Sequence, residues 1–206
     1  MGEADGWADG WWAAAGRRPS PNADARPVDA VVDLLVVHSI SLPPGEYGSD
    51  DVERLFMNRL DPQAHPYFEA IASLRVSSHF LIRRDGAMLQ FVSCHDRAWH
   101  AGVSSWRGRA ACNDYSVGVE LEGLEGTPFA GVQYDALVRL AGAICTRYPL
   151  AWVAGHEHVA PGRKGDPGRG FDWNRLRGMA REHSLQLAAD VCDPTAEVAE
   201  NDPPVA

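Results

Sequence analysis

The sequence predicts a single α/β domain in which helices flank a mixed central β-sheet. Apolar runs typical of buried strands alternate with segments of helical periodicity, and one pair of strands is joined by Asp-Gly, a favoured hairpin turn. The chain has 206 residues, 45% of them hydrophobic, so it can bury one substantial core. We expect the domain at residues 31–187, with an extended segment at 1–30 packed on it and a disordered tail at 188–206.

The first half of the domain contains a strand, a helix and a hairpin. Residues 31–37 are a largely β-branched apolar run, and we predict a central strand that delivers His38 at its C-terminal end. A helix is predicted at 66–74, where a proline occupies the first position. Residues 80–92 are predicted to form a hairpin whose two-residue turn is Asp85-Gly86.

The second half contains a strand and two helices. Residues 116–121 alternate strictly, so we predict a strand with Val117, Val119 and Leu121 on one face and Ser116, Gly118 and Glu120 on the other. An amphipathic helix is predicted at 133–148, because its apolar residues recur at helical spacing. A last helix is predicted at 173–187.

Charge and hydropathy exclude several function classes. A formal net charge of −9 argues against a nucleic-acid binder, which needs a basic face. No run approaches the ~18 apolar residues of a spanning helix, and the N-terminus lacks the basic start and apolar core of a signal peptide. The four cysteines include no Cys-x-x-Cys pair and are expected to be free thiols. We therefore expect a cytoplasmic protein without nucleic-acid or membrane partners; the oligomeric state stays open, with a monomer favoured.

Residues 155–168 carry chemistry that a free loop does not need. The segment holds two histidines, a lysine and an aspartate among two prolines and four glycines. Imidazole nitrogen and carboxylate oxygen are zinc ligands, and a nearby ammonium can stabilise developing negative charge. His38, His156 and Asp166 could form a set that leaves the fourth zinc position open, as in catalytic sites. Without that partnership His38 would be an ordinary structural histidine, the interpretation that applies to His65, His79, His95, His100 and His183.

A general base is also present. Glu120 lies on the face of the predicted strand opposite its apolar residues, where a carboxylate has to be solvated, paired or functional. Glu122 shares that face, so spacing alone does not choose between the two. On residue type and position alone, Lys164 is an ordinary loop lysine.

Eight segments of the chain resemble the AmpD-type N-acetylmuramyl-L-alanine amidases, zinc enzymes of bacterial cell-wall recycling. The resemblance extends from about Gly6 to Leu176 and rests on residues 17–21, 35–46, 60–66, 74–79, 81–86, 97–104, 112–123 and 155–168. It implies the fold shared by type 2 amidases and peptidoglycan-recognition proteins. The implied reaction is cleavage of the amide between the lactyl group and L-alanine in 1,6-anhydro-N-acetylmuramyl peptides, small molecules of the cytosol.

The resemblance also implies roles for individual residues. His38, His156 and Asp166 would bind one Zn²⁺, Glu120 rather than Glu122 would be the catalytic carboxylate, and Lys164 would lie near the substrate carbonyl. Substrate-binding positions would be Ser39 on the sugar side of the groove, and Arg75 and Trp99 on the peptide side.

Three positions depart from the family pattern. His158 stands where aspartate is usual, and in an extended segment it would share a face with His156, as a rival ligand or a partner behind it. Ser39 stands where asparagine is common. Ala111 stands where an arginine is expected to hold the peptide carboxylate, and Arg109, two residues away, could replace it.

Two other functions fit the same residues. A peptidoglycan-fragment binding module without catalysis is disfavoured because the three ligands, Glu120 and Lys164 are all present. An amidase that acts on intact cell wall is disfavoured by the absence of a recognisable signal peptide.

Overall fold

The centre of the protein is a seven-stranded mixed sheet in a computed structural model, of which residues 6–191 are described. All neighbouring strands are parallel except β6 and β7, which form an antiparallel hairpin. The predicted mixed sheet is therefore confirmed. The strands lie in the order β13 (Gln186–Leu187), β12 (Trp152–Gly155), β5 (Leu34–Ile40), β11 (Ser116–Glu122), β6 (Phe80–Ile82), β7 (Met88–Gln90) and β3 (Gly16–Arg17).

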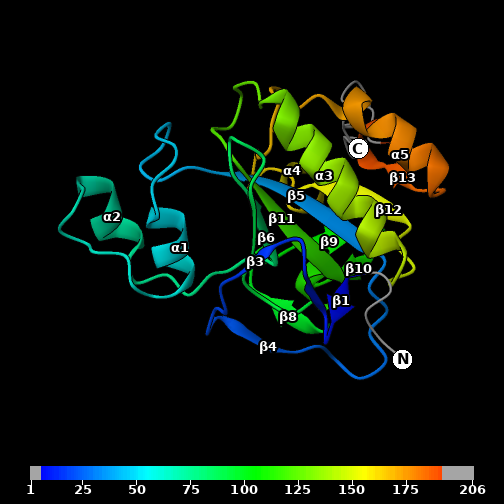
Figure 1. Ribbon diagram of the computed structural model, residues 1–206, viewed down its shortest axis with the longest axis horizontal. Helices are drawn as coiled ribbons and strands as arrows, with labels where there is room; N and C mark the ends of the chain where they lie inside the picture. Colours follow the sequence, from blue (N-terminus) through cyan, green and yellow to red (C-terminus); the bar gives the residue numbers. More distant parts are fainter. Residues whose placement is uncertain (1–5, 192–206) are drawn as a thin grey trace, which may run out of the picture.

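One face of the sheet is covered by helices. Figure 1 shows α3 (Gly131–Cys145) lying along the sheet, with α5 (Arg177–Glu182) beside it. Residues that alternate along β5 and β11, such as Leu35 and Val119, are buried in one cluster with Leu137 and Leu140 of α3. Side chains of a strand point to opposite faces in turn, so every second residue of these strands packs on the helices.

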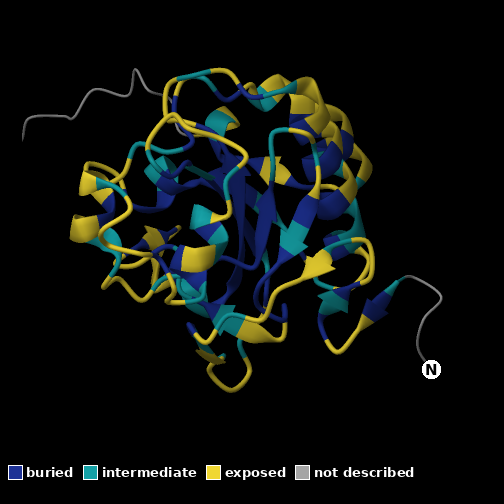
Figure 2. Cartoon of the chain, turned by 60° about the vertical axis from the view of Figure 1, so that its left-hand side comes forward, coloured by how far each residue is buried: buried dark blue, intermediate teal, exposed yellow. Residues whose placement is uncertain are grey.

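The opposite face positions the candidate site. Leu34 and Val36 of β5 pack there in a second cluster with Trp106 and Val159. The cover consists of short elements: β9 (Ser105–Trp106), β10 (Arg109–Ala110), the 3-10 turn η1 (Cys112–Asp114) and α4 (His156–Val159). His38 and Glu120 have the same parity as this second set, so they face away from α3. Figure 2 shows the central strands buried beneath exposed loops.

Two helices stand beside the sheet. Figure 1 shows α1 (Asp51–Phe56) and α2 (Pro66–Ile71) away from the helical layer. Their apolar residues, including Phe56 and Phe68, form a third cluster with Leu81 and Phe91. This cluster builds one wall of the pocket described below.

The N-terminal segment contributes strands as well as extended chain. Trp7 and Trp12 are buried in the cluster between the sheet and α3. They belong to the paired strands β1 (Trp7–Ala8) and β2 (Trp11–Trp12). Further along, β4 (Ala23–Ala25) pairs with β8 (Asp96–Ala98). The segment thus packs against the rest of the chain through both aromatic burial and backbone pairing.

Several predicted boundaries shift. The first central strand runs through His38 to Ile40 instead of ending before the histidine. The first two predicted helices end at Ile71 and Cys145, short of the predicted ends. The hairpin is confirmed, but Arg83 N–H donates to the carbonyl of Ala87, so the loop has three residues and closes on Gly86 with φ of 83°.

The predicted last helix is wrong beyond residue 182. The 3-10 turn η2 (Trp173–Leu176) and α5 are followed by the edge strand β13, because Leu187 is buried against the sheet. The expected tail at 188–206 begins with the turn η3 (Ala188–Asp190), in which Ala188 is buried, and residues 192–206, including Cys192, lie outside the described residues. Between residues 6 and 191 no helix is both long and apolar enough to cross a bilayer.

Candidate metal centre and active site

Three neighbouring strands deliver the candidate residues to one place. His38 of β5 stands directly opposite Glu120 of β11 in the parallel register. On the other side of β5, Gly155 pairs with Val37, so that His156 follows β12 as the first residue of α4. Asp166 reaches the same place from the loop after α4, where its carbonyl accepts a hydrogen bond from Glu157 N–H at 2.9 Å.

The donor atoms of His38, His156 and Asp166 converge on one point. The two Nδ1 atoms are 3.0 Å apart, and each lies 3.2–3.3 Å from a carboxylate oxygen of Asp166. Tetrahedral zinc with ligands at about 2.0–2.1 Å places ligand atoms roughly 3.3 Å apart, so this spacing fits the ion. Within residues 6–191 these three form a group able to hold a metal ion.

The protonation states of two of these residues suit a metal ion. Burial lowers the pKa of His38 to about 4, although the bond to Asp166 opposes this effect. Burial raises the pKa of Asp166, but its bonds to His156 and His38 more than offset this and hold it well below its usual range. At neutral pH His38 is therefore neutral and Asp166 ionised, the forms that bind metal.

Glu120 presents a buried carboxylate with spare hydrogen-bonding capacity. The residue is 8% exposed, and its Oε2 has no hydrogen-bond partner among the described residues. Burial raises its pKa well above the usual value; Asp166 adds to this shift and Lys164 opposes it. An unpaired buried carboxylate costs stability, so its position beside the donor group indicates a chemical role.

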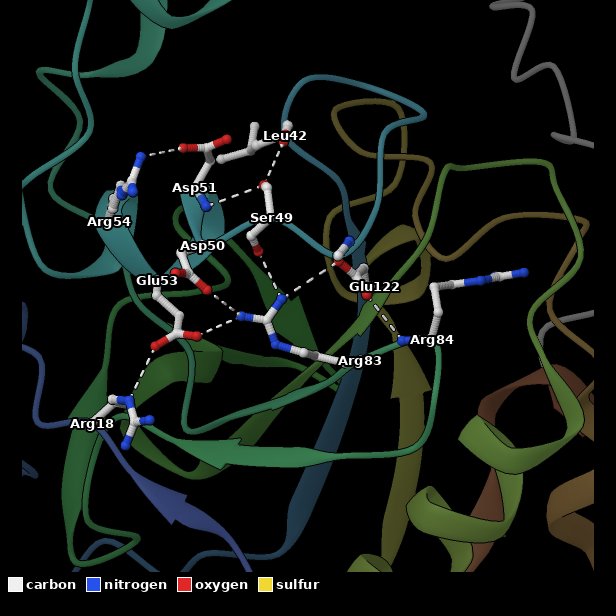
Figure 3. A network of polar contacts seen from close by, with 11 residues as sticks. Arg18, Leu42, Ser49, Asp50, Asp51, Glu53, Arg54, Arg83, Arg84 and Glu122 are labelled. Carbon is white, nitrogen blue, oxygen red and sulfur yellow. Dashed lines mark hydrogen bonds and ion pairs between the residues drawn. The ribbon is translucent and has the colours of Figure 1, made fainter. Parts of the chain in front are cut away.

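Glu122 is occupied by structural contacts (Figure 3). Its carboxylate accepts hydrogen bonds from the backbone N–H groups of Gly48 at 2.6 Å and Arg84 at 2.9 Å, and Arg83 Nη1 lies 3.8 Å away. These contacts fasten the loop before α1 to the end of β11. The two glutamates that spacing could not separate therefore differ: Glu122 is satisfied, whereas Glu120 has an oxygen free for another partner.

A pocket of about 440 Å³ opens in front of the donor group. Besides the candidate ligands, its lining includes Glu120, Lys164, Ser39 and Trp99. Trp99 is held by a hydrogen bond from its Nε1 to Asp24 at 3.1 Å. One wall is apolar and comes from the loop before α1 and from α1 and α2: Leu42, Pro44, Leu55, Phe56, Tyr67 and Ile71.

Two predicted substrate-binding residues are not brought into this pocket. Arg75 is exposed and donates to the carbonyls of Ser73 and Leu74, so its contact with substrate stays a prediction. The replacement of the arginine expected at 111 by Arg109 likewise stays a prediction. Its Nη2 lies 2.7 and 2.9 Å from the carboxylate oxygens of Asp33, just before β5 and toward the opposite end of that strand from His38.

His158 is not grouped with the candidate ligands. Residues 156–159 are helical, so residues two apart do not share a face as they would in an extended segment. Its Nδ1 accepts a hydrogen bond from Gly155 N–H at 2.9 Å, and its ring packs on Trp173. The prediction that His158 could replace His156 as a ligand assumed an extended backbone, which the structure does not have.

Two residues near the site were not predicted. Arg163 lines the pocket and donates to the carbonyls of Ala101 and Val103, which joins the loop after α4 to the loop after β8. His100 lies 2.9 Å from His38 through ring nitrogens. Both stand within segments that carry the family resemblance, but neither has a distinctive spacing to signal its role.

A further buried histidine predicts a pH dependence of stability. Burial lowers the pKa of His79 well below 6.5, and the charge of Arg26 adds to this shift. Its Nδ1 accepts a hydrogen bond from Gly118 N–H at 3.0 Å. Below pH 6.5 His79 is protonated in the unfolded chain but stays neutral in the folded chain. The free energy of unfolding therefore falls as pH is lowered.

We therefore expect His79→Gln to flatten this dependence by up to about 1.4 kcal/mol per pH unit. Urea unfolding of the zinc-free wild type and variant between pH 7 and pH 5 measures it. Replacing the buried ring will also lower stability at pH 7, so the slope rather than the value is the readout. Parallel curves for the two proteins would contradict the assignment.

The comparisons with known proteins agree with this geometry. A family model described as N-acetylmuramoyl-L-alanine amidase matches residues 28–169. The chain belongs to this amidase family. The 1,6-anhydro-N-acetylmuramyl-L-alanine amidase AmpD of Citrobacter freundii is 52% identical to this amidase over 178 residues, covering 85% of this chain and 95% of the relative. AmpD of Escherichia coli K12 is 51% identical over 177 residues, covering 85% and 97%.

Solved structures place the amidase in the same fold. The crystal structure of a Se-Met AmpD derivative has a TM-score of 0.80 at 52% identity and covers 84% of this chain and 97% of its own. Escherichia coli AmiD, solved with anhydro-N-acetylmuramic acid-L-Ala-D-gamma-Glu-L-Lys, has a TM-score of 0.53 at 28% identity and covers 78% and 61%. Human PGRP-IBETAC, at 22% identity and a TM-score of 0.51 over 78% and 89%, shares the fold.

Proposed function

We propose that this amidase hydrolyses the amide between the lactyl group and L-alanine of 1,6-anhydro-N-acetylmuramyl peptides, with one zinc ion held by His38, His156 and Asp166. The observation that carries the proposal is the convergence of three metal-binding atoms beside an unpaired carboxylate in an open pocket. When bound, zinc supplies Lewis acidity toward the amide carbonyl and the attacking water.

The chain's own residues account for proton movement and charge. Glu120 accepts a proton from the attacking water and passes it to the leaving alanine nitrogen, which its free Oε2 and raised pKa support. Lys164, on the pocket wall, stabilises the negative charge that develops on the carbonyl oxygen.

The pocket suits a ligand with one sugar and a short peptide. It combines polar groups near the donor atoms with an apolar wall from α1 and α2. Ser39 and Trp99 both line the pocket, and we assign Ser39 to the sugar and Trp99 to the peptide. The relatives named for the anhydro sugar match this chain over nearly their whole length, which supports that substrate over intact wall.

We place the reaction in the cytosol. Cys94, Cys112 and Cys145 are free thiols in the structure, and free thiols are compatible with a reducing compartment. Cell fractionation tests this part of the proposal without affecting the assignment of the reaction.

The decisive experiment compares two substrates. Zinc-loaded protein is incubated with a purified anhydromuramyl tripeptide and, separately, with intact cell-wall sacculi, and free peptide with an L-alanine N-terminus is quantified by mass spectrometry. We expect rapid release from the small substrate and little from sacculi. Binding without release would favour the silent binding module, and the reverse preference would favour a wall-degrading amidase.

A further inference from the structure

The hydrogen bonds behind His38 form a chain that ends on the backbone. Nε2 of His38, the nitrogen turned away from the proposed zinc, lies 2.9 Å from Nδ1 of His100. Nε2 of His100 lies 3.2 Å from Oγ of Ser116, and this hydroxyl donates to the carbonyl of Cys112 at 2.6 Å. Two imidazoles and one hydroxyl thus connect the metal position to a carbonyl oxygen.

The last member of this chain fixes the direction of every bond in it. A carbonyl oxygen carries no proton, so the Ser116 hydroxyl hydrogen is used on Cys112 and its oxygen has to accept from His100. Neutral His100 then bears its proton on Nε2 and offers the lone pair of Nδ1 to the N–H at Nε2 of His38. His38 is left with its lone pair on Nδ1, the atom that faces the other two proposed ligands.

The backbone of β11 holds the His100 ring in this place. A Cβ atom at Gly118 would lie 2.6 Å from Cγ of His100, so the ring packs directly on the strand where a glycine leaves room. The ring meets that of His38 edge-on, with centroids 5.0 Å apart and planes at 88°. Ser116 and Glu120 are on the same strand and face, which places the anchor of His100 two residues before Gly118 and the proposed base two residues after it.

We propose that His100 is a positioning residue that sets the tautomer and orientation of His38, so that Nδ1 is the ligating atom. The inference rests on the zinc site of the proposed function. The ring of His156 is oriented by a different partner, the carbonyl oxygen of Ala101, which lies 3.1 Å from its Nε2. One short stretch, residues 100–101, therefore orients both histidine ligands without supplying a ligand itself.

The test is the zinc affinity of the full-length protein, measured by competition with a chromogenic chelator. His100→Phe keeps a ring but removes both nitrogens, and we expect a loss of roughly 10–100-fold, as for other partners behind metal ligands. His100→Asn restores an acceptor and should recover part of the affinity. Ser116→Ala lies farther from the metal and frees the His100 proton, so a smaller loss in the same direction is expected.

A spectroscopic readout separates positioning from general structural damage. In the zinc-loaded wild type, the N–H proton at Nε2 of His38 should appear as a slowly exchanging imidazole signal in nuclear magnetic resonance spectra. That signal should be lost in His100→Phe even when thermal unfolding shows a folded protein. If this variant does not fold, Ser116→Ala and His100→Asn still decide the question.

His158→Phe is the matched control, since it removes another partly buried imidazole, two residues after the proposed ligand His156. Its zinc affinity should equal that of the wild type. Wild-type affinity in folded His100→Phe, or an equal loss in His158→Phe, would overturn the inference about His100. A wild type that bound no zinc would instead overturn the proposed function.

Discussion

Replacing Glu120 with glutamine is expected to lower kcat by roughly 10²–10⁴-fold while the protein keeps its fold and its zinc. Glutamine has nearly the same shape, but its amide cannot accept a proton from water and return it to the leaving nitrogen. Steady-state kinetics on the anhydromuramyl tripeptide, with zinc quantified in the same preparation, measures the effect. KM should change much less than kcat, because the carboxylate acts on the reacting atoms.

The same variant is expected to gain stability in its zinc-free form although it loses activity. The pKa of Glu120 is raised, mainly by burial, so at neutral pH the unfolded chain ionises this group more readily than the folded chain does. Stability is therefore lost as pH rises through the range between the unfolded and folded pKa values. Zinc-free Glu120→Gln should accordingly unfold at a higher temperature than zinc-free wild type at pH 7, a gain that mere damage to the site would not produce.

Glu122→Gln is the natural control, because it lies two residues further on the same strand and face. Its carboxylate accepts two backbone N–H groups, so the amide should cost about 1–3 kcal/mol of stability and leave turnover of the folded protein intact. Wild-type kcat in zinc-loaded Glu120→Gln would show that another residue moves the proton. Loss of turnover in Glu122→Gln alone would point to Glu122.

The sequence was sufficient where local pattern determines structure. Strict alternation over residues 116–121 predicted which side chains pack on the helical layer and left Glu120 on the other face, as the structure has it. The apolar run before His38 predicted a central strand for the same reason. What pattern could not supply was register, and the pairing of His38 with Glu120 depends on it.

The features that the sequence did not predict have a common origin, since each depends on contacts between distant segments. The segment 173–187 has helical composition, yet its end joins the sheet beside β12, an outcome decided by tertiary packing. The contact between Arg109 and Asp33 was not predictable for the same reason, because the two residues lie 76 positions apart in sequence. The contacts of His100 with His38 and Ser116 were likewise not predictable from the residues next to it in sequence.

Replacing Asp166 with alanine is expected to weaken zinc binding by more than roughly 10–100-fold, because it removes a proposed ligand. A loss of roughly 10–100-fold is typical when the residue removed only hydrogen-bonds to a metal ligand. The two remaining histidines provide only two protein ligands, whereas catalytic zinc takes three. The loss also removes the one negative charge of the ligand set, since His38 is neutral at pH 7. Turnover should fall with zinc content, and a chelator should abolish wild-type activity reversibly.

The informative comparison for Asp166→Ala is His158→Ala, which removes the remaining candidate ligand of the same segment. Zinc analysis of both proteins after exhaustive dialysis should show a depleted Asp166→Ala and a fully loaded His158→Ala, because His158 is engaged with Gly155 and Trp173 rather than with the donor group. The opposite pair of results would require α4 to unwind so that His158 reaches the metal. Such results would also mean that Asp166 does not contact the two imidazoles that hold its pKa low. They would therefore contradict both the proposed ligand set and the charge state assigned to Asp166.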